Sequence, residues 1–214
     1  MLKRLRFDDR ESWLAGRGQG IGGSDAAAVV GLSPWMSPIE LWKVKMGMSR
    51  QKDLSGNAAV EQGNRMEQIL RKLYGELHPE YAVEYHQFDI LYQEERPYIF
   101  ATLDGELLSS DGRRGILEIK TATPTGKAGW AEWSNGGMKN AYYAQCLHQL
   151  LATGYDFVRL FACLFSQNGD MTLTEREIER EEVTEDLNWL LNEERQFWKG
   201  YVERGVMPPM RLML

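Results

Sequence analysis

Cysteine is scarce in this 214-residue sequence, which contains only Cys146 and Cys163. Two thiols cannot build the disulfide framework that holds many small secreted domains together. Both lie in apolar stretches, so we expect them to be free and buried. A chain of this length can bury a full core without cross-links, and we expect residues 1–214 to form a single domain.

Long hydrophobic runs are also absent. No apolar stretch approaches the length of a membrane span. Residues 1–8 lack the apolar core of a signal peptide. We therefore expect a protein that makes no contact with a membrane and that works in the cytoplasm.

The third scarcity is of positive charge. The sequence has 25 lysines and arginines against 31 aspartates and glutamates, a net charge of −6. Nucleic-acid-binding domains usually carry a basic footprint, so this balance argues mildly against such a partner. The argument weakens if several of the acids bind a metal ion, because the ion offsets their charge. A local basic rim can also coexist with an acidic remainder.

The most informative stretch of the sequence runs from Ala101 to Thr121. Asp104 closes an aromatic and β-branched strand, and the next strand carries Glu118 and Lys120. Side chains alternate along a strand, so Glu118 and Lys120 share one face of it. Two acids and a lysine brought to one place suit a hard divalent cation and an attacking water.

An ordinary structural explanation of the same residues stays open at this point. A Glu-Ile-Lys tripeptide is also typical of the solvated side of an antiparallel strand, where opposite charges stand two residues apart. For the tripeptide alone this explanation is the favoured one. The Asp-Gly pair at the end of the preceding strand adds weight to a catalytic role.

A glycine-rich loop over residues 16–23 leads into an alanine-rich segment. We expect Ser24 to cap a helix that ends at Gly31. A helix N-terminus with a hydroxyl and a nearby cation, Arg17, is a ready anion site. A capped helix after a flexible turn explains the same residues, and Asp25 would repel a phosphate. On the residues alone, the capped helix is favoured.

Hydrophobic periodicity predicts the other elements. Helices are expected over residues 7–17, 38–47, 57–77, 139–153 and 182–202, and strands over 82–93, 98–103, 115–121, 157–165 and 171–180. The first three strands are expected to be consecutive and antiparallel, followed by a long loop over residues 121–140. Glu67 lies at the edge of an apolar stripe, where it either pairs with Arg71 or faces a metal. His148 is expected to be structural.

The order of these elements resembles the PD-(D/E)xK nuclease superfamily, and within it the lambda-exonuclease and YqaJ-type phage recombination exonucleases. The segments that match lie at residues 17, 20–27, 32–35, 63–67, 101–105, 117–121 and 142–145. They span most of the chain, and their joint order is far more specific than any one of them. Leu103 replaces the proline that usually precedes the aspartate.

The resemblance implies an α/β fold with a restriction-endonuclease-like core, in which a mixed, twisted β-sheet is flanked by helices. The site is expected at one edge of the sheet. The resemblance also implies that Asp104, Glu118 and the backbone carbonyl of Ile119 bind Mg²⁺, for which Mn²⁺ can substitute. Glu67 would add a further carboxylate beside the metal.

Other roles are implied by the same matches. Lys120 would orient or deprotonate the water that attacks the phosphodiester, and Gln145 would support the lysine or the water. Arg17 and Ser24, together with Thr102, would hold a 5′-phosphate. With the resemblance included, the anion site becomes the preferred interpretation of the glycine-rich loop.

Enzymes of this kind resect one strand of linear double-stranded DNA in the 5′→3′ direction as a ring-shaped homotrimer, beside a single-strand annealing protein. The resemblance thus implies a phage- or prophage-encoded enzyme in a bacterial cytoplasm, acting on duplex ends with a 5′-phosphate. A ring would keep an acidic chain on DNA by topology. Two alternatives remain open: a structure-selective or restriction-type endonuclease with the same metal site, and a non-catalytic DNA-binding module with structural ion pairs.

Overall fold

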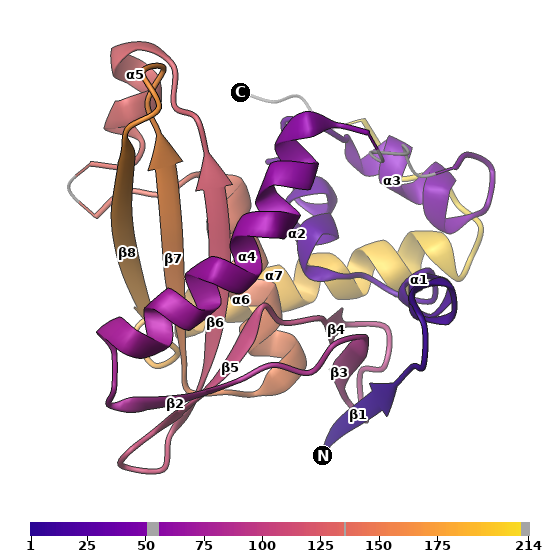
Figure 1. The fold of residues 1–214 in the computed structure, drawn as a ribbon. Coiled ribbons are helices and arrows are strands. Elements are labelled where there is room, and N and C mark those ends of the chain that lie inside the picture. Colours follow the sequence, from indigo (N-terminus) through magenta and orange to yellow (C-terminus); the bar gives the residue numbers. More distant parts are fainter. Residues whose placement is uncertain (51–55, 135, 211–214) are drawn as a thin grey trace.

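The computed structural model of the protein describes residues 1–50, 56–134 and 136–210 (Figure 1). The strands are β1 (Leu2–Arg6), β2 (Tyr81–Glu84), β3 (Asp89–Gln93), β4 (Phe100–Ala101), β5 (Gly105–Ser109), β6 (Arg114–Ala122), β7 (Phe157–Phe165) and β8 (Met171–Glu179). The helices are α1 (Arg10–Arg17), α2 (Gly23–Val29), α3 (Pro38–Lys45), α4 (Ala58–Leu77), α5 (Gly126–Ala131), α6 (Asn140–Thr153), α7 (Thr184–Arg195) and the π-helical segment η1 (Gln196–Val202).

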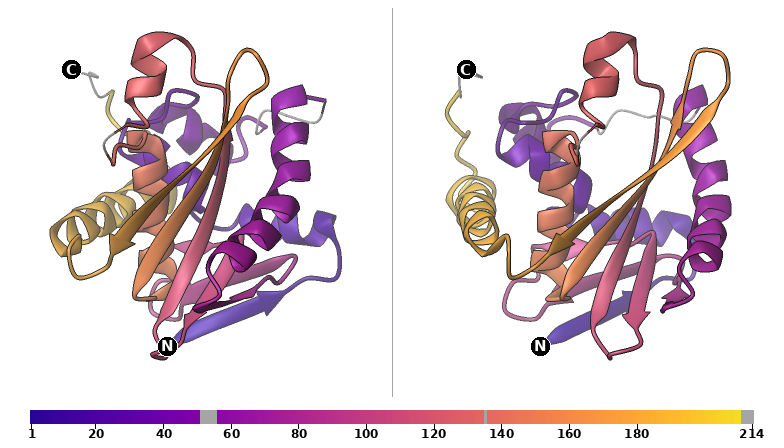
Figure 2. Two further views of the ribbon diagram at one scale, coloured as in Figure 1. Left: turned by 60° about the vertical axis from the view of Figure 1, so that its left-hand side comes forward. Right: turned by 90° about the vertical axis from the view of Figure 1, so that its left-hand side faces the viewer.

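The strands form two sheets, one in the order β2-β5-β6-β7-β8 and one in the order β1-β3-β4. In the five-stranded sheet β6 runs parallel to β7, while the other neighbours are antiparallel. A parallel pair needs a long crossover, which α5 and α6 provide. The sheet is strongly twisted, with α4 on one face and α6 on the other (Figures 1 and 2). The expected mixed, helix-flanked sheet is confirmed.

The alternation of side chains along β6 decides what faces each helix. Leu117 and Ile119 pack in a buried cluster with Leu70 and Tyr74 of α4. Glu118 points the other way, toward α6, where it contacts glutamine side chains. The prediction that residues 118 and 120 share the face opposite 117 and 119 is therefore confirmed in the geometry of the central strand.

The expected single strand over residues 82–93 is wrong. The chain forms β2 in the five-stranded sheet, leaves it, and then forms β3 in the other sheet. Phe88 lies in the crossover with φ 62°, a left-handed backbone that bulky residues rarely adopt. The expected run of three antiparallel strands also fails, because β4 and β6 lie in different sheets and β5 intervenes. β1, which pairs with β3, was not anticipated.

The observed helices agree with their predicted bounds more closely than the strands do. α3, α4 and α6 lie within a residue or two of their predicted bounds, and α7 with η1 covers the predicted last helix. The expected cap of α2 is wrong: Gly22 is the N-cap and Ser24 lies within the first turn. The predicted long loop after β6 contains α5, and Trp133 is buried there. Cys146 and Cys163 are buried and unbridged, as expected.

No helix in residues 1–50, 56–134 and 136–210 is long and apolar enough to cross a membrane.

Candidate active site

The site begins at a place where the sheet is incomplete. β5 starts at Gly105, which pairs with Leu117, so β6 from Glu118 onward pairs only with β7. Asp104 immediately precedes β5, and its Oδ2 accepts a hydrogen bond from the Ile119 backbone N–H at 2.8 Å. A carboxylate thus takes the position of a missing strand partner. This is how the fold brings Asp104 beside the residues of β6.

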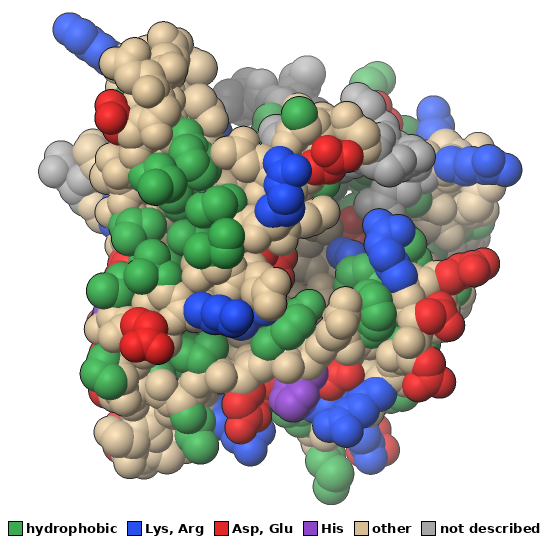
Figure 3. Space-filling view, viewed as in Figure 1, with side chains coloured by type: hydrophobic (Ala, Val, Ile, Leu, Met, Phe, Trp, Pro, Cys, Tyr) green, Lys and Arg blue, Asp and Glu red, His purple; other side chains and the backbone are tan. Residues whose placement is uncertain are grey.

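A cleft of about 420 Å³ opens at this unpaired half of β6. It is bounded by α1, α4, the β2–β3 crossover, residues 102–104, β6 and one residue of α6. The surface is hollowed between α4 and α1, and charged side chains are visible in the hollow (Figure 3). Of the residues singled out in the sequence, those that line the cleft are Arg17, Glu67, Thr102, Asp104, Glu118, Ile119, Lys120 and Gln145.

Glu118 is almost completely enclosed, with 1% of its surface exposed. Its Oε1 forms an ion pair with Lys120 and accepts a hydrogen bond from Gln145 Nε2 at 2.7 Å. Its Oε2 accepts a hydrogen bond from Gln149 Nε2 at 2.5 Å. Gln145 Oε1 in turn accepts from Lys120 Nζ at 3.0 Å. One amide of α6 therefore fixes both charged groups of the Glu-x-Lys pair.

The carboxylates of the cleft crowd one another. Burial, followed by the nearby charges of Glu118 and Glu67, raises the pKa of Asp104 well above its ordinary value. Asp104 keeps an open side toward the cleft, but protein atoms displace most of the water around it. Burial also raises the pKa of Glu67, where Arg71 acts against the shift and Glu118 adds to it. Burial and mutual repulsion therefore both disfavour the ionised forms of Asp104 and Glu67.

Lys120 holds its proton. Burial alone would lower the pKa of its ammonium, but the Glu118 carboxylate, followed by Asp104, outweighs burial and the net pKa is raised. Lys120 Nζ also lies 5.1 Å from the centroid of the Tyr142 ring, which favours a cation. At neutral pH this side chain is a hydrogen-bond donor and a positive charge.

Glu67 forms the expected pair with Arg71, and it also lines the cleft. Its carboxylate lines the cleft and also accepts a hydrogen bond from Arg71 Nη2 at 2.5 Å. Arg71 donates through Nε to the Asp104 carbonyl, and its guanidinium stacks 3.5 Å from the Tyr85 ring centroid. Arg71 thus joins α4 to the segment that carries Asp104.

The expected phosphate-binding residues separate in the structure. Arg17 and Thr102 line the cleft, whereas Ser24 is exposed and does not. Arg17 stacks over Trp13 at 4.6 Å and has no hydrogen bond or ion pair to a described residue. Burial lowers its pKa, and the charges of Asp25 and Asp104 counter this only partly. A half-buried guanidinium without a carboxylate partner is suited to an incoming anion.

The start of α2 is already satisfied internally. Gly22 N donates to the Asp25 carboxylate at 3.0 Å, and Lys45 Nζ lies 2.7 Å from the same carboxylate. Because Asp25 supplies the negative charge there, the helix N-terminus offers little to a phosphate. The anion-binding hypothesis therefore rests on Arg17 and Thr102 rather than on the helix start.

The donors present fit a hard divalent cation. Asp104, Glu118 and backbone carbonyls are oxygen ligands, and the N–H and C=O of one residue in a strand point to the same side, so the Ile119 carbonyl also faces the open edge. Within the described residues, no three Asp, Glu, His or Cys side chains already form a metal-binding group. Mg²⁺ commonly uses one or two carboxylates and completes its shell with water and phosphate. The pKa of Asp104 is raised, and a bound cation would stabilise the ionised carboxylate and lower this pKa.

Sequence reasoning missed residues in and behind the cleft. Gln149 does not line the cleft, but it is 1% exposed and donates to Glu118, and a second amide four residues after Gln145 was a usable signal. Trp13, Tyr85 and Phe88 form an aromatic part of the wall. Trp13 lies in α1, whereas Tyr85 and Phe88 lie in the β2–β3 crossover, which local periodicity did not reveal.

Comparison with known proteins agrees with this architecture. The model of the YqaJ-like viral recombinase domain matches residues 12–156. The uncharacterized protein YqaJ of Bacillus subtilis (strain 168) is 31% identical over 202 residues, or 94% of this chain. The chain spans 59% of the length of that relative.

Two solved structures share the fold. An alkaline exonuclease from Laribacter hongkongensis, LHK-Exo, superposes with a TM-score of 0.59 at 19% identity, covering 92% of this chain and 97% of that one; it has also been solved in complex with dAMP. A phage-related exonuclease from Haemophilus somnus 129PT gives a TM-score of 0.54 at 14% identity, with 87% and 96% coverage. The expected PD-(D/E)xK-like α/β fold is confirmed.

Proposed function

The chain belongs to the YqaJ-like viral recombinase domain family, and from this premise we propose that it is a Mg²⁺-dependent exonuclease that resects one strand of linear duplex DNA in the 5′→3′ direction. The observation that carries the proposal is the meeting of Asp104, Glu118 and Lys120 in one cleft at the unpaired half of β6. Glu67 and Gln145 line the same cleft. The reaction is hydrolysis of a phosphodiester.

The residues of the cleft have distinct tasks in this proposal. Asp104, Glu118 and the Ile119 carbonyl would hold Mg²⁺, or Mn²⁺ in its place, with Glu67 nearby. A metal held there would supply Lewis-acid polarisation of the scissile phosphate and a lowered pKa for a bound water. The Lys120 ammonium orients the attacking water by hydrogen bonding, because its raised pKa keeps it protonated. Gln145 fixes the positions of Lys120 and Glu118, because its amide forms one hydrogen bond with each of them.

The polarity of the reaction follows from the anion-binding side of the cleft. Water attacks phosphorus, the bond from phosphorus to the 3′ oxygen of the terminal nucleotide breaks, and the phosphate stays on the shortened strand. Each cut thus regenerates the 5′-phosphate that Arg17 and Thr102 would hold. Ser24 is a weaker candidate because it lies outside the cleft.

The remaining parts of the proposal concern partners. We propose that the protein forms a ring-shaped homotrimer around DNA, since a ring retains an acidic chain on its substrate by topology. A single-strand annealing protein would take up the exposed strand. The setting would be phage-type recombination in a bacterial cytoplasm.

Linear duplex DNA labelled separately at its 5′ and 3′ ends tests this function. With Mg²⁺ we expect prompt release of a labelled mononucleotide from the 5′ label, and no release when EDTA replaces the metal. Covalently closed plasmid should stay intact. Cleavage of the plasmid would favour a structure-selective or restriction-type endonuclease, and DNA binding without cleavage in any metal would favour a binding module.

A further inference from the structure

The Glu118 carboxylate is held from two opposite directions. Oε1 meets Lys120 and Gln145, both of which line the cleft. Oε2 meets Gln149, which does not line the cleft and is 1% exposed. Among the described residues, the side-chain hydrogen bond of Gln149 to the proposed metal site is the one to Glu118.

The amide of Gln149 has one satisfied end. Its Nε2 donates to Glu118 at 2.5 Å, while its Oε1 is buried without a hydrogen-bond partner among the described residues. Turning the amide over would place Oε1 against a carboxylate oxygen, which is repulsive. A buried acceptor without a partner normally costs stability, and such groups call for an explanation beyond packing. Holding Glu118 supplies that explanation.

The glycine-rich loop provides the space for this arrangement. Gly23 is the first residue of α2, which packs against α6. A Cβ built on Gly23 would lie 3.2 Å from Cγ of Gln145 and 3.7 Å from Cγ of Gln149. A side chain at this position would press on Gln145, while its contact with Gln149 would have an ordinary length. Gly23 thus leaves room for the side chain of Gln145 beside Glu118.

We propose that Gln149 is a positioning residue of the metal site, which fixes Oε2 of Glu118 so that Oε1 is the oxygen presented to the cation. The inference rests on the proposed function, because it assigns a role toward the metal of that same cleft. Hydrogen-bond partners of ligating carboxylates typically change metal affinity by about 10–100-fold when they are removed.

The variant Gln149→Met keeps the length of the side chain and removes its donor. Its matched control is Gln93→Met, because Gln93 Nε2 donates to the Thr153 carbonyl at 2.7 Å and so ties another strand to the same helix, with no part in the cleft. The Mg²⁺ dissociation constant is measured by calorimetry, and the melting temperature without metal is measured alongside. We expect Mg²⁺ affinity to fall by about 10–100-fold in Gln149→Met alone.

Equal Mg²⁺ affinity in Gln149→Met and the unchanged protein would overturn the inference, even if the variant melts earlier. If the unchanged protein binds no Mg²⁺, the proposed function fails as well, so the two failures are distinguishable. If Gln149→Met does not fold, Gln149→Asn decides, because the shorter side chain withdraws the amide from Oε2 of Glu118; its control is Gln93→Asn. Weaker Mg²⁺ binding in Gln149→Asn alone supports the inference, and unchanged binding overturns it.

Discussion

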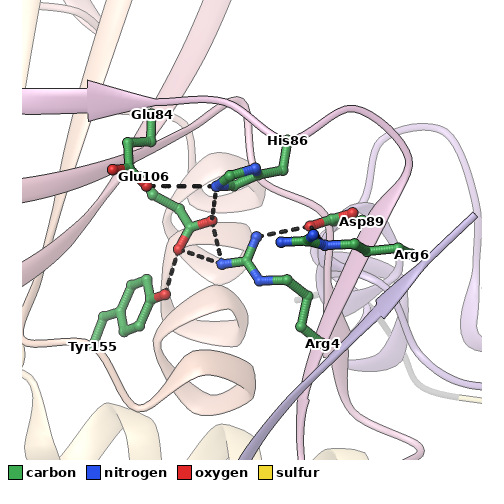
Figure 4. A network of polar contacts seen from close by, with 7 residues as sticks. All are labelled: Arg4, Arg6, Glu84, His86, Asp89, Glu106 and Tyr155. Atoms are coloured by element: carbon green, nitrogen blue, oxygen red, sulfur yellow. Dashed lines mark hydrogen bonds and ion pairs between the residues drawn. The ribbon is translucent and has the colours of Figure 1, made fainter.

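Two clusters of charged side chains in this protein differ in how their charges are compensated. In the first, which we call the arginine network, Arg4 donates to both Glu106 oxygens at 2.6 and 2.8 Å and to Asp89 at 2.8 Å (Figure 4). The Tyr155 hydroxyl donates to Glu106 at 2.5 Å, and His86 lies 3.8 Å from it. Each of these two acids has a close cationic partner.

The arginine network joins the two sheets, since Arg4 belongs to β1 and Glu106 to β5. The second cluster lies in the cleft and consists of Glu67, Asp104 and Glu118; Asp89 lines the same cleft but is paired with Arg4. Lys120 pairs with one of them and Arg71 with another, and the carboxylate of Asp104 is left with a backbone N–H. Burial, followed by the charges of Glu118 and Glu67, raises the pKa of Asp104.

The difference separates a structural ion network from the cluster that we propose to be functional. The arginine network is complete without any added component, so its role is to hold the sheets together. The cleft tolerates a crowding of acids that costs stability, and such sites persist where a ligand supplies the missing charge. The contrast extends to single residues: Arg4 has two carboxylate partners, whereas Arg17 has no ion pair with the described residues.

The largest expected effect is on cleavage by Lys120→Ala. Removal of the water-orienting ammonium should lower the single-turnover cleavage rate by about 10³-fold or more, while DNA binding remains measurable. Rates are followed on linear duplex with Mg²⁺ under excess enzyme. If the variant cleaves like the unchanged protein, the cleft cluster does not have the catalytic role proposed for it.

The next effect concerns the unpaired guanidinium of the cleft. Arg17→Ala should reduce the preference for 5′-phosphorylated over 5′-hydroxyl ends by about 10–100-fold, which is the range for a charged hydrogen bond. The control is Arg6→Ala, an exposed arginine of β1. Competition between the two kinds of end measures the preference. If Arg17→Ala retains it in full, the phosphate is held elsewhere.

Glu106→Gln tests the structural role of the arginine network. Loss of the charge opposite Arg4 should lower the free energy of unfolding by about 1.5–3 kcal/mol, measured by urea denaturation. The cleavage rate under stabilising conditions should stay close to that of the unchanged protein. The opposite pattern, with cleavage lost at full stability, would place the arginine network in the active site.

These outcomes bear on what the sequence could reveal. Three elements were predictable from the sequence: the strand with Glu118 and Lys120, the helix with Glu67 and the helix with Gln145. Each shows a hydrophobic periodicity of two residues, typical of a strand, or of 3.6 residues, typical of a helix. Their meeting at one cleft was inferred from the resemblance and not from periodicity. The opening in the sheet beside Glu118 could not be derived, because it depends on where β5 begins.

The failures have a common cause in tertiary structure. The apolar alternation from Val83 to Tyr92 changes register near Phe88, where the chain passes from one sheet to the other, so the predicted single strand is in fact two. Ser24 has the residue type of an N-cap, but the Asp25 carboxylate caps Gly22 and moves the helix start. Gln149 looks like a stray amide on an apolar face until Glu118, from another element, is placed opposite it.

The smallest expected effect comes from a buried pair outside both clusters. His148 Nδ1 lies 2.6 Å from Glu194 Oε1, and Nε2 donates to the Phe100 carbonyl at 2.8 Å. Burial opposes the charged form, but Glu194 and the Phe100 carbonyl outweigh it, and the pKa of His148 is raised. The predicted structural role of His148 is confirmed in its fully buried, bonded position.

The sign of the pH effect follows from this direction. A raised folded-state pKa contributes stability that is fully present below the unfolded value of about 6.5 and is lost as the pH rises through the folded value. Unfolding free energy should therefore decline above pH 6.5, by at most about 1.4 kcal/mol per pH unit for one proton. Denaturation at several pH values measures the slope, and His148→Gln should flatten it. An identical slope in the variant would contradict the assignment.

The central claim is that a divalent cation relieves the crowded acids of the cleft. It is tested most directly by the melting temperature of the unchanged protein and of Asp104→Asn across a Mg²⁺ titration. Because burial and two neighbouring acids disfavour ionised Asp104, the variant should melt higher without metal. Mg²⁺ should then raise the melting temperature of the unchanged protein and leave that of the variant constant. Equal Mg²⁺-induced increases in both proteins, or none in either, would contradict the account.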